Sequence, residues 1–112
     1  MKQQIGRDAE DRALNYLEQK GLSLIQRNYR SRFGEIDLIM QDEKTVVFIE
    51  VRYRRNKAFG GASYSVTPQK QQRLLTTANQ FLQQYAPQHP ARMDVLALEG
   101  NDIEWIKNAF EA

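Results

Sequence analysis

Cysteine is absent from the 112-residue sequence, which excludes disulfide bonds and metal sites built on thiolates. The only histidine is His89, so a zinc site made of several histidines of one chain is not expected. Any metal would therefore be held by oxygen ligands, which suit Mg²⁺ or Mn²⁺. The lack of cysteine also fits the cytoplasmic location that we expect.

Long hydrophobic runs are absent as well. The apolar runs are far shorter than the roughly 20 residues of a membrane span, and residues 1–8 lack the apolar segment of a secretory signal. We therefore expect no membrane association. With 41% hydrophobic and 27% charged residues, the composition is that of a globular protein. The length predicts one domain that spans residues 1–112.

A strong charge of one sign is also missing, because 16 basic residues face 14 acidic ones and the net charge is only +2. The distribution is more informative, since basic residues flank two acidic positions, Asp37 and Glu50. Phosphates that approach a carboxylate-bound cation would require such flanks, although a solvated, charge-balanced surface is the alternative. The flanking residues are Arg27, Arg30, Arg32, Arg52, Arg54, Arg55, Lys57, Lys70 and Arg73.

Hydrophobic periodicity predicts helices and strands in the order α-β-β-β-α-β-β. Gly21 ends the first helix, and Thr67 with Pro68 predicts the start of the second. The expected helices cover residues 4–20 and 68–85, and the expected strands cover 22–29, 34–40, 45–52, 93–98 and 103–106. The result is an α/β fold with one mixed β-sheet of about five strands flanked by helices. The third and fourth strands are expected to be parallel, because a helix connects them.

Two carboxylates stand in unexpectedly apolar surroundings in the predicted hairpin of residues 34–52. Asp37 lies in the middle of its first strand and Glu50 near the end of its second, and a carboxylate there is costly unless it is paired, hydrogen-bonded or metal-bound. Because the strands are adjacent, both acids can converge on one divalent cation, with Arg52 on the same face as Glu50. Such a cation can lower the pKa of a bound water and promote phosphodiester cleavage. A cross-strand ion pair is the structural alternative.

The pattern Asp…Glu-x-basic on a hairpin after a helix resembles the PD-(D/E)xK nuclease superfamily. The chain as a whole resembles the small bacterial family UPF0102, the YraN-like proteins. The resemblance implies a single endonuclease-like domain over residues 1–112, with a restriction-endonuclease-like fold close to that of Holliday junction resolvases. It also implies a metal-dependent endonuclease acting on branched or structured DNA. The alternative is a catalytically inactive nucleic-acid-binding protein of the same fold. The similar segments are residues 6–10, 28–30, 34–39, 48–54, 66–73 and 92–95.

The resemblance also implies residue roles. Asp37 and Glu50 match the metal-binding acids, and Glu10 matches a helix carboxylate that completes an Mg²⁺ or Mn²⁺ site. Arg52 stands where the superfamily usually has lysine, and arginine can clamp a phosphate but cannot act as a general base. Three alternatives therefore remain open. The metal alone activates water, or Lys70 supplies the ammonium group, or activity has been lost.

The remaining expectations concern partners and neighbouring residues. Glu35 shares a strand face with Asp37 and could support the site, but we expect it to be a solvent residue near the turn. We expect Asp94 to have a structural role, paired with Arg92 or another basic group. A resolvase must cut two strands, so a homodimer is expected for that activity, and a scaffold that binds another protein is a third reading of the chain. The residues expected to contact DNA are Arg30, Arg54, Arg55, Lys57, Lys70 and Arg73.

Overall fold

The structure, a computed structural model, describes residues 2–54 and 66–111, with side chains in the first helix from residue 7 onward. It confirms the predicted fold class and the order of elements. The helices are α1 (Lys2–Gln19) and α2 (Pro68–Tyr85), and the strands are β1 (Ser23–Ser31), β2 (Gly34–Asp42), β3 (Thr45–Arg54), β4 (Ala91–Glu99) and β5 (Asp102–Ile106). The strands reach further than hydrophobicity predicted, because polar residues such as Asp42 and Thr45 continue the backbone pairing into the turn.

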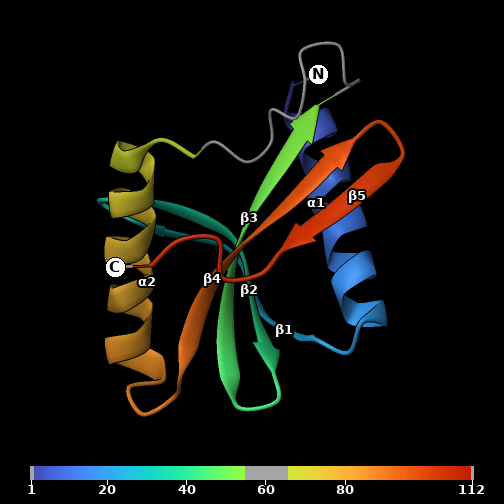
Figure 1. Cartoon of the computed structure of the whole chain (residues 1–112). Helices are drawn as coiled ribbons and strands as arrows, with labels where there is room; N and C mark the ends of the chain where they lie inside the picture. The colour runs from blue at the N-terminus through green and yellow to red at the C-terminus, as the bar shows by residue number, and fades with distance from the viewer. Residues whose placement is uncertain (1, 55–65, 112) are drawn as a thin grey trace.

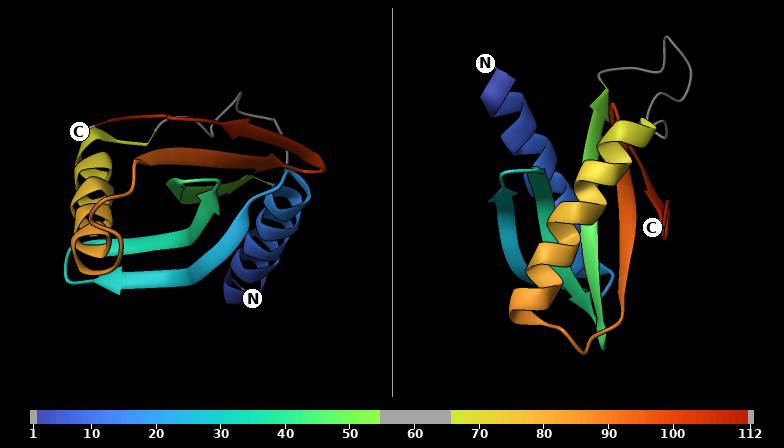
Figure 2. Two further views of the ribbon diagram at one scale, coloured as in Figure 1. Left: turned by 90° about the horizontal axis from the view of Figure 1, so that it is seen from below. Right: turned by 90° about the vertical axis from the view of Figure 1, so that its left-hand side faces the viewer.

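The five strands form one sheet in the order β1-β2-β3-β4-β5. The first three strands pair antiparallel, β3 and β4 pair parallel as predicted, and β5 returns antiparallel to β4. The helix α2 is the connection between the two parallel strands and covers one face of the sheet, whereas α1 covers the other (Figure 1, Figure 2). No helix of the described residues is long and apolar enough to cross a membrane.

Each helix packs its apolar stripe on its own face of the sheet, so the sheet separates two layers of core. The layer under α2 contains Ile36, Ile39, Val46, Phe48, Leu74, Ala78, Phe81, Met93 and Val95. The layer under α1 contains Ala13, Leu17, Leu22, Leu38, Met40, Val47, Ile49 and Leu96.

Strand β2 changes its pattern of alternation at Asp37. Ile36 packs in the layer under α2 and Leu38 in the layer under α1, although two residues separated by one position should share a face of a regular strand. The pairing of β2 with β3 also begins only at Leu38 and Ile49. Before that point β2 pairs with β1 alone, so the hairpin of β1 and β2 turns away from β3 (Figure 1). Asp37 therefore lies where the sheet forks.

Candidate metal centre

A cleft of about 640 Å³ opens where β2 and β3 diverge, beside the first turns of α2. It brings together predicted site residues that are separated by up to 36 positions in the chain, from Asp37 to Arg73. The residues that line the cleft are Gly34, Glu35, Asp37, Glu50, Val51, Arg52, Tyr53, Arg54, Lys70, Arg73 and Leu74.

Three carboxylates form an acidic cluster at this fork. Glu10 comes from α1, while Glu35 and Asp37 come from β2, and one oxygen of each lies within 4.8 Å of the others. This group could hold a metal ion. We expected Glu35 to be a solvent residue, yet it belongs to the cluster. The available signal was that residues 35 and 37 lie two positions apart and can share one face of a strand.

The Asp37 carboxylate also replaces a missing backbone partner. Because β2 has turned away from β3, the amide of Val51 has no β2 carbonyl to pair with, and it donates to Asp37 Oδ2 at 2.8 Å instead. Burial, the largest cause, and the charge of Glu50 after it raise the pKa of Asp37, which lies at about 8 when all influences are combined. The hydrogen bond from Val51 lowers this pKa, whereas a hydrogen bond with Glu50 and the charge of Glu10 raise it. The fork thus places Asp37 beside other carboxylates, whose charges favour its protonated form.

Glu50 lies beside Asp37 but outside the acidic cluster, so Glu10, Asp37 and Glu50 do not make one tight set of ligands. The Glu50 carboxylate is buried on the α2 side of β3, where Lys70 Nζ lies 2.6 Å from its Oε2. The Nη1 atom of Arg52 lies 3.8 Å from the same oxygen. Lys70 is therefore the closer of the two cations to this acid.

The position of Lys70 follows from the start of α2. Thr67 caps the helix by accepting a hydrogen bond from the Lys70 amide, and Pro68 follows as the first helical residue. A cation in the first turn opposes the helix dipole, and the ion pair with Glu50 offsets this cost. The Lys70 side chain remains 44% exposed, so its ammonium group can still reach a ligand in the cleft.

Asn28 connects two members of the acidic cluster and was missed at the level of sequence. Its Nδ2 lies 3.1 and 3.2 Å from the two carboxylate oxygens of Glu10 and 3.4 Å from Oε2 of Glu35. It adopts a φ of 52° inside β1, a left-handed conformation that asparagine tolerates better than most residues. The Arg30 Nε atom binds Glu35 Oε1 at 2.7 Å. Donors from β1 thus fix the outer carboxylates of the cluster.

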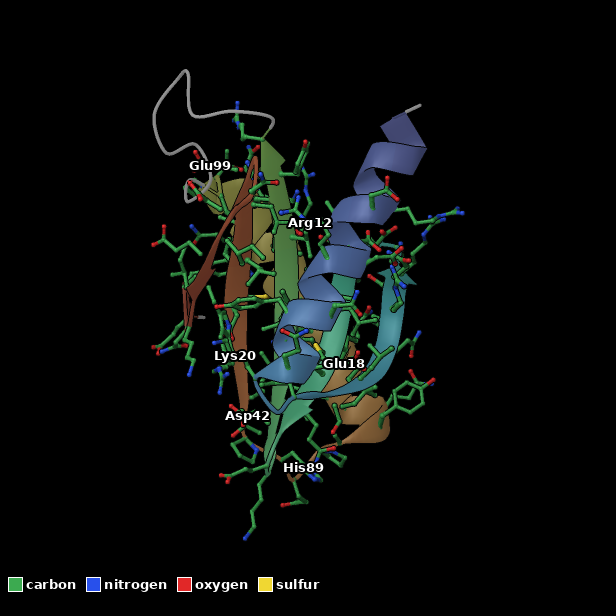
Figure 3. The ribbon with its side chains drawn as sticks, turned by 90° about the vertical axis from the view of Figure 1, so that its right-hand side faces the viewer. Arg12, Glu18, Lys20, Asp42, His89 and Glu99 are labelled. Atoms are coloured by element: carbon green, nitrogen blue, oxygen red, sulfur yellow. The ribbon has the colours of Figure 1, made fainter. Side chains whose placement is uncertain are left out.

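The donor set of this region consists of oxygen atoms. Among the described residues that line the cleft there is no histidine. Figure 3 places His89 near Asp42, at the end of the sheet opposite Glu99. The cleft lies at the Glu99 end, because Glu99 pairs with Arg54, which lines the cleft. The acidic cluster consists of carboxylates alone, so it offers only oxygen ligands to a metal ion.

The residues expected to contact DNA fall into three groups according to their position relative to the cleft. Arg54, Lys70 and Arg73 line the cleft. Arg30 lies at its β1 side, with its side chain 78% exposed and bound to Glu35. Arg55 and Lys57 lie outside the described residues.

Comparison with known proteins gives a family match over most of the chain. The sequence pattern of "Uncharacterised protein family UPF0102" matches residues 9–98. A UPF0102 protein of Herminiimonas arsenicoxydans is 50% identical over 111 residues, which cover 99% of this chain and 90% of the relative. A UPF0102 protein of Nitrosomonas eutropha is 52% identical over 107 residues, with 95% and 92% covered. One of Pseudomonas savastanoi pv. phaseolicola is 48% identical over 118 residues, with 99% and 96% covered.

Proposed function

The chain belongs to the uncharacterised protein family UPF0102, and we propose that it is a metal-dependent endonuclease that cleaves phosphodiester bonds in branched or structured DNA. The observation that carries this proposal is the acidic cluster of Glu10, Glu35 and Asp37, with oxygens within 4.8 Å of one another. It opens to a cleft that arginine and lysine side chains also line. Carboxylates that gather beside cations, where an anionic backbone could enter, are suited to this chemistry.

The residues present fit a divalent cation. Glu10, Glu35 and Asp37 would hold it through carboxylate oxygens, with Glu50 beside them, which is the ligand chemistry that Mg²⁺ and Mn²⁺ prefer. Burial and, after it, the charge of Glu50 raise the pKa of Asp37, and a bound cation would favour the ionised form of this carboxylate. When bound, the ion supplies Lewis-acid chemistry, which activates water and stabilises charge on the phosphate.

The chain's own cations have separate tasks in this proposal. Arg52, Arg54 and Arg73 line the cleft and would hold the phosphate groups of the DNA, since guanidinium groups bind phosphate in a bidentate way. Lys70 would supply the ammonium group that the superfamily usually carries on the strand. The 2.6 Å contact of Lys70 with Glu50, against 3.8 Å for Arg52, supports this alternative over the other two.

A cleavage panel tests the proposal. Four-way junctions, flaps, duplexes, single strands and RNA are incubated with Mg²⁺ or Mn²⁺, and cleavage is expected for at least the branched DNA. Glu10→Gln should abolish cleavage, whereas Glu18→Gln, eight residues later on the same helix and exposed, should not. The absence of cleavage on every substrate with both metals would contradict the proposal.

A second candidate is a nucleic-acid-binding protein of the same fold without activity, and the arginine at position 52 favours it. It predicts salt-sensitive DNA binding that is indifferent to metal and weakened by Arg54→Ala. Calorimetry that shows Mn²⁺ binding in the wild type and not in Asp37→Asn would count against it. A resolvase additionally requires two sites, so the mass of the protein in solution should then be that of a homodimer.

A further inference from the structure

Large apolar side chains are exposed at only a few of the described positions, and three of these are aromatic. One of the three lines the cleft, and a second is the chain neighbour of a residue that lines it. Tyr53 is 39% exposed and lines it, while Phe33 is 43% exposed and directly precedes Gly34, which is part of the cleft wall. The third, Tyr85, is the last residue of α2 and lies far along the helix from Lys70. Exposing an aromatic ring forgoes burial energy, so two rings beside one cleft call for an explanation.

Phe33 is held in place by its neighbours. It lies in the turn between β1 and β2, where its amide donates to Ser31 Oγ at 3.0 Å. Ser31 Oγ also lies 3.1 Å from Thr77 Oγ1 of α2. A Cβ atom on Gly34 would lie only 3.5 Å from the same Thr77 oxygen, so the hairpin packs closely on the helix. Figure 2 shows this turn beside α2. The backbone of Phe33 is therefore held beside α2, next to Gly34 of the cleft wall.

Arginine accompanies both rings. The guanidinium carbon of Arg32 lies 5.6 Å from the ring centroid of Phe33. Tyr53 stands between Arg52 and Arg54, and all three line the cleft. An aromatic face with an adjacent guanidinium is the combination by which proteins bind single-stranded nucleic acid, because the bases stack and the cation contacts the backbone.

The two rings lie within reach of a strand that passes the acids. Phe33 is four residues from Asp37, or roughly 13 Å along an extended strand, and Tyr53 is three residues from Glu50, or roughly 10 Å. At the roughly 3.4 Å rise of a stacked strand, these spans correspond to about four nucleotides from Phe33 to Asp37 and about three from Tyr53 to Glu50, which lies beside Asp37. In a continuous duplex the flat faces of those bases are covered by their neighbours, so they cannot stack on a side chain.

We propose that the DNA strand in the cleft is unpaired next to the phosphate at the acidic cluster, with one base stacked on Phe33 and another on Tyr53. This rests on the proposed function, because DNA is the ligand there. The inference adds to the proposed function the class of DNA substrate, which contains a gap, flap or loop and is not a continuous duplex.

Binding measured without divalent cations tests this separately from cleavage. A gapped duplex with 2-aminopurine in the gap and a continuous duplex of equal length are titrated with protein. The wild type should bind the gapped DNA more tightly and quench its fluorescence. The double variant Phe33→Ala/Tyr53→Ala should lose at least about 30-fold in affinity for gapped DNA, together with the quenching, with less than about a 2-fold change for the duplex.

Two controls sharpen the result. Tyr85→Ala removes the exposed aromatic side chain at the far end of α2 and should leave both affinities unchanged. Phe33→Trp should keep the quenching, since it retains a flat ring. Equal binding of gapped DNA by the wild type and the double variant, with an unchanged melting temperature, would overturn the inference, as would a preference for the continuous duplex. Failure of cleavage in the substrate panel would instead contradict the proposed function and leave the stacking result intact.

Discussion

Two aspartates in neighbouring parts of the same sheet have opposite surroundings. Asp94 on β4 is fully buried and pairs across the ladder with Ile49 of β3. Its carboxylate accepts hydrogen bonds from Arg92 Nε at 3.1 and 3.2 Å, from Trp105 Nε1 at 2.8 Å and from the amide of Asn108 at 2.8 Å. The expected pairing with Arg92 is thus confirmed, and the lone pairs of this acid are used within the fold.

On its other side, Ile49 pairs with Leu38 of β2, and Asp37 directly precedes Leu38. The carboxylate of Asp37 faces an open cleft. It accepts a hydrogen bond from Val51, while burial and, after it, the like charges of Glu50 and Glu10 raise its pKa. A buried acid with a complete set of donors stabilises a fold, whereas one with like-charged neighbours is poised to bind a cation. The contrast assigns a structural role to Asp94 and the proposed functional role to Asp37.

The largest effect that this contrast predicts is on cleavage. Asp37→Asn removes a charged ligand while keeping the shape of the side chain, so cleavage of branched DNA should fall at least 1,000-fold, or by about 4 kcal/mol of activation free energy. Initial rates with Mn²⁺ in excess measure this. Asp94→Asn, assayed at a temperature where it is folded, should retain wild-type cleavage, and equal losses in the two variants would break the comparison.

The second effect is on stability and concerns the other aspartate. Asp94→Asn leaves Arg92 without a buried counter-charge, although Asp42 remains 3.2 Å from its Nη1. One Arg92 nitrogen, Nη2, already lacks a hydrogen-bond partner among the described residues. We expect the free energy of unfolding to fall by about 2–4 kcal/mol, measured by urea denaturation. A variant as stable as the wild type would show that this closed network contributes little.

The third effect separates the two cations beside Glu50. Lys70→Ala removes the ammonium group 2.6 Å from Glu50 and should lower cleavage about 10- to 100-fold at saturating DNA. Arg52→Ala should mainly weaken DNA binding, because its proposed contact is with phosphate. Separate measurement of kcat and KM distinguishes the two. If Arg52→Ala instead lowers kcat and Lys70→Ala mainly weakens DNA binding, the role proposed for Lys70 belongs to Arg52.

The smallest effect is a pH dependence of stability. Folding raises the pKa of Asp37 from 3.8 to about 8, so the folded protein binds this proton more tightly than the unfolded chain does. Its stabilisation is complete below pH 3.8 and is lost as pH rises through 8, so the free energy of unfolding should fall across this range. Because the cleft admits water, we expect a loss of about 1–2 kcal/mol between pH 5 and 8.5.

Asp37→Asn should remove this slope, whereas Glu18→Gln should keep it. Urea denaturation at several pH values, without divalent cations, measures the difference. Addition of Mn²⁺ at pH 8.5 should restore stability to the wild type and not to Asp37→Asn. Parallel slopes for the wild type and Asp37→Asn would show that this carboxyl does not change its proton affinity on folding.

Local patterns in the sequence were enough to predict much of the fold. The alternation of apolar residues predicted the hairpin that carries Asp37 and Glu50, and Thr67 with Pro68 predicted the start of α2, which the structure confirms. The crossover helix predicted the parallel pairing of β3 with β4. These features depend on residues close together in the chain or on the general handedness and packing of helices and strands, so they can be read without coordinates.

The composition of the site depended on contacts that spacing does not encode. Regular alternation could not reveal the change of face at Asp37, which results from β2 following β1 rather than β3. Glu10 comes from a different element than Glu35, and Asn28, in a left-handed conformation, donates to both of these carboxylates. Each of these features reflects how separate elements pack, which local propensity leaves undetermined.

By itself, then, the sequence determined which residue types were available: carboxylates for an oxygen-ligand site, cations for phosphate and no thiolate. It also determined the strands on which Asp37 and Glu50 lie. Only the tertiary structure decided which of these groups meet. The fork of the sheet and the first turn of α2 bring Asp37, Glu50 and Lys70 to one cleft, and the packing of α1 places Glu10 beside Asp37. The physical reason is that periodicity sets the face of a side chain, whereas the distance between two faces is set by packing across the core.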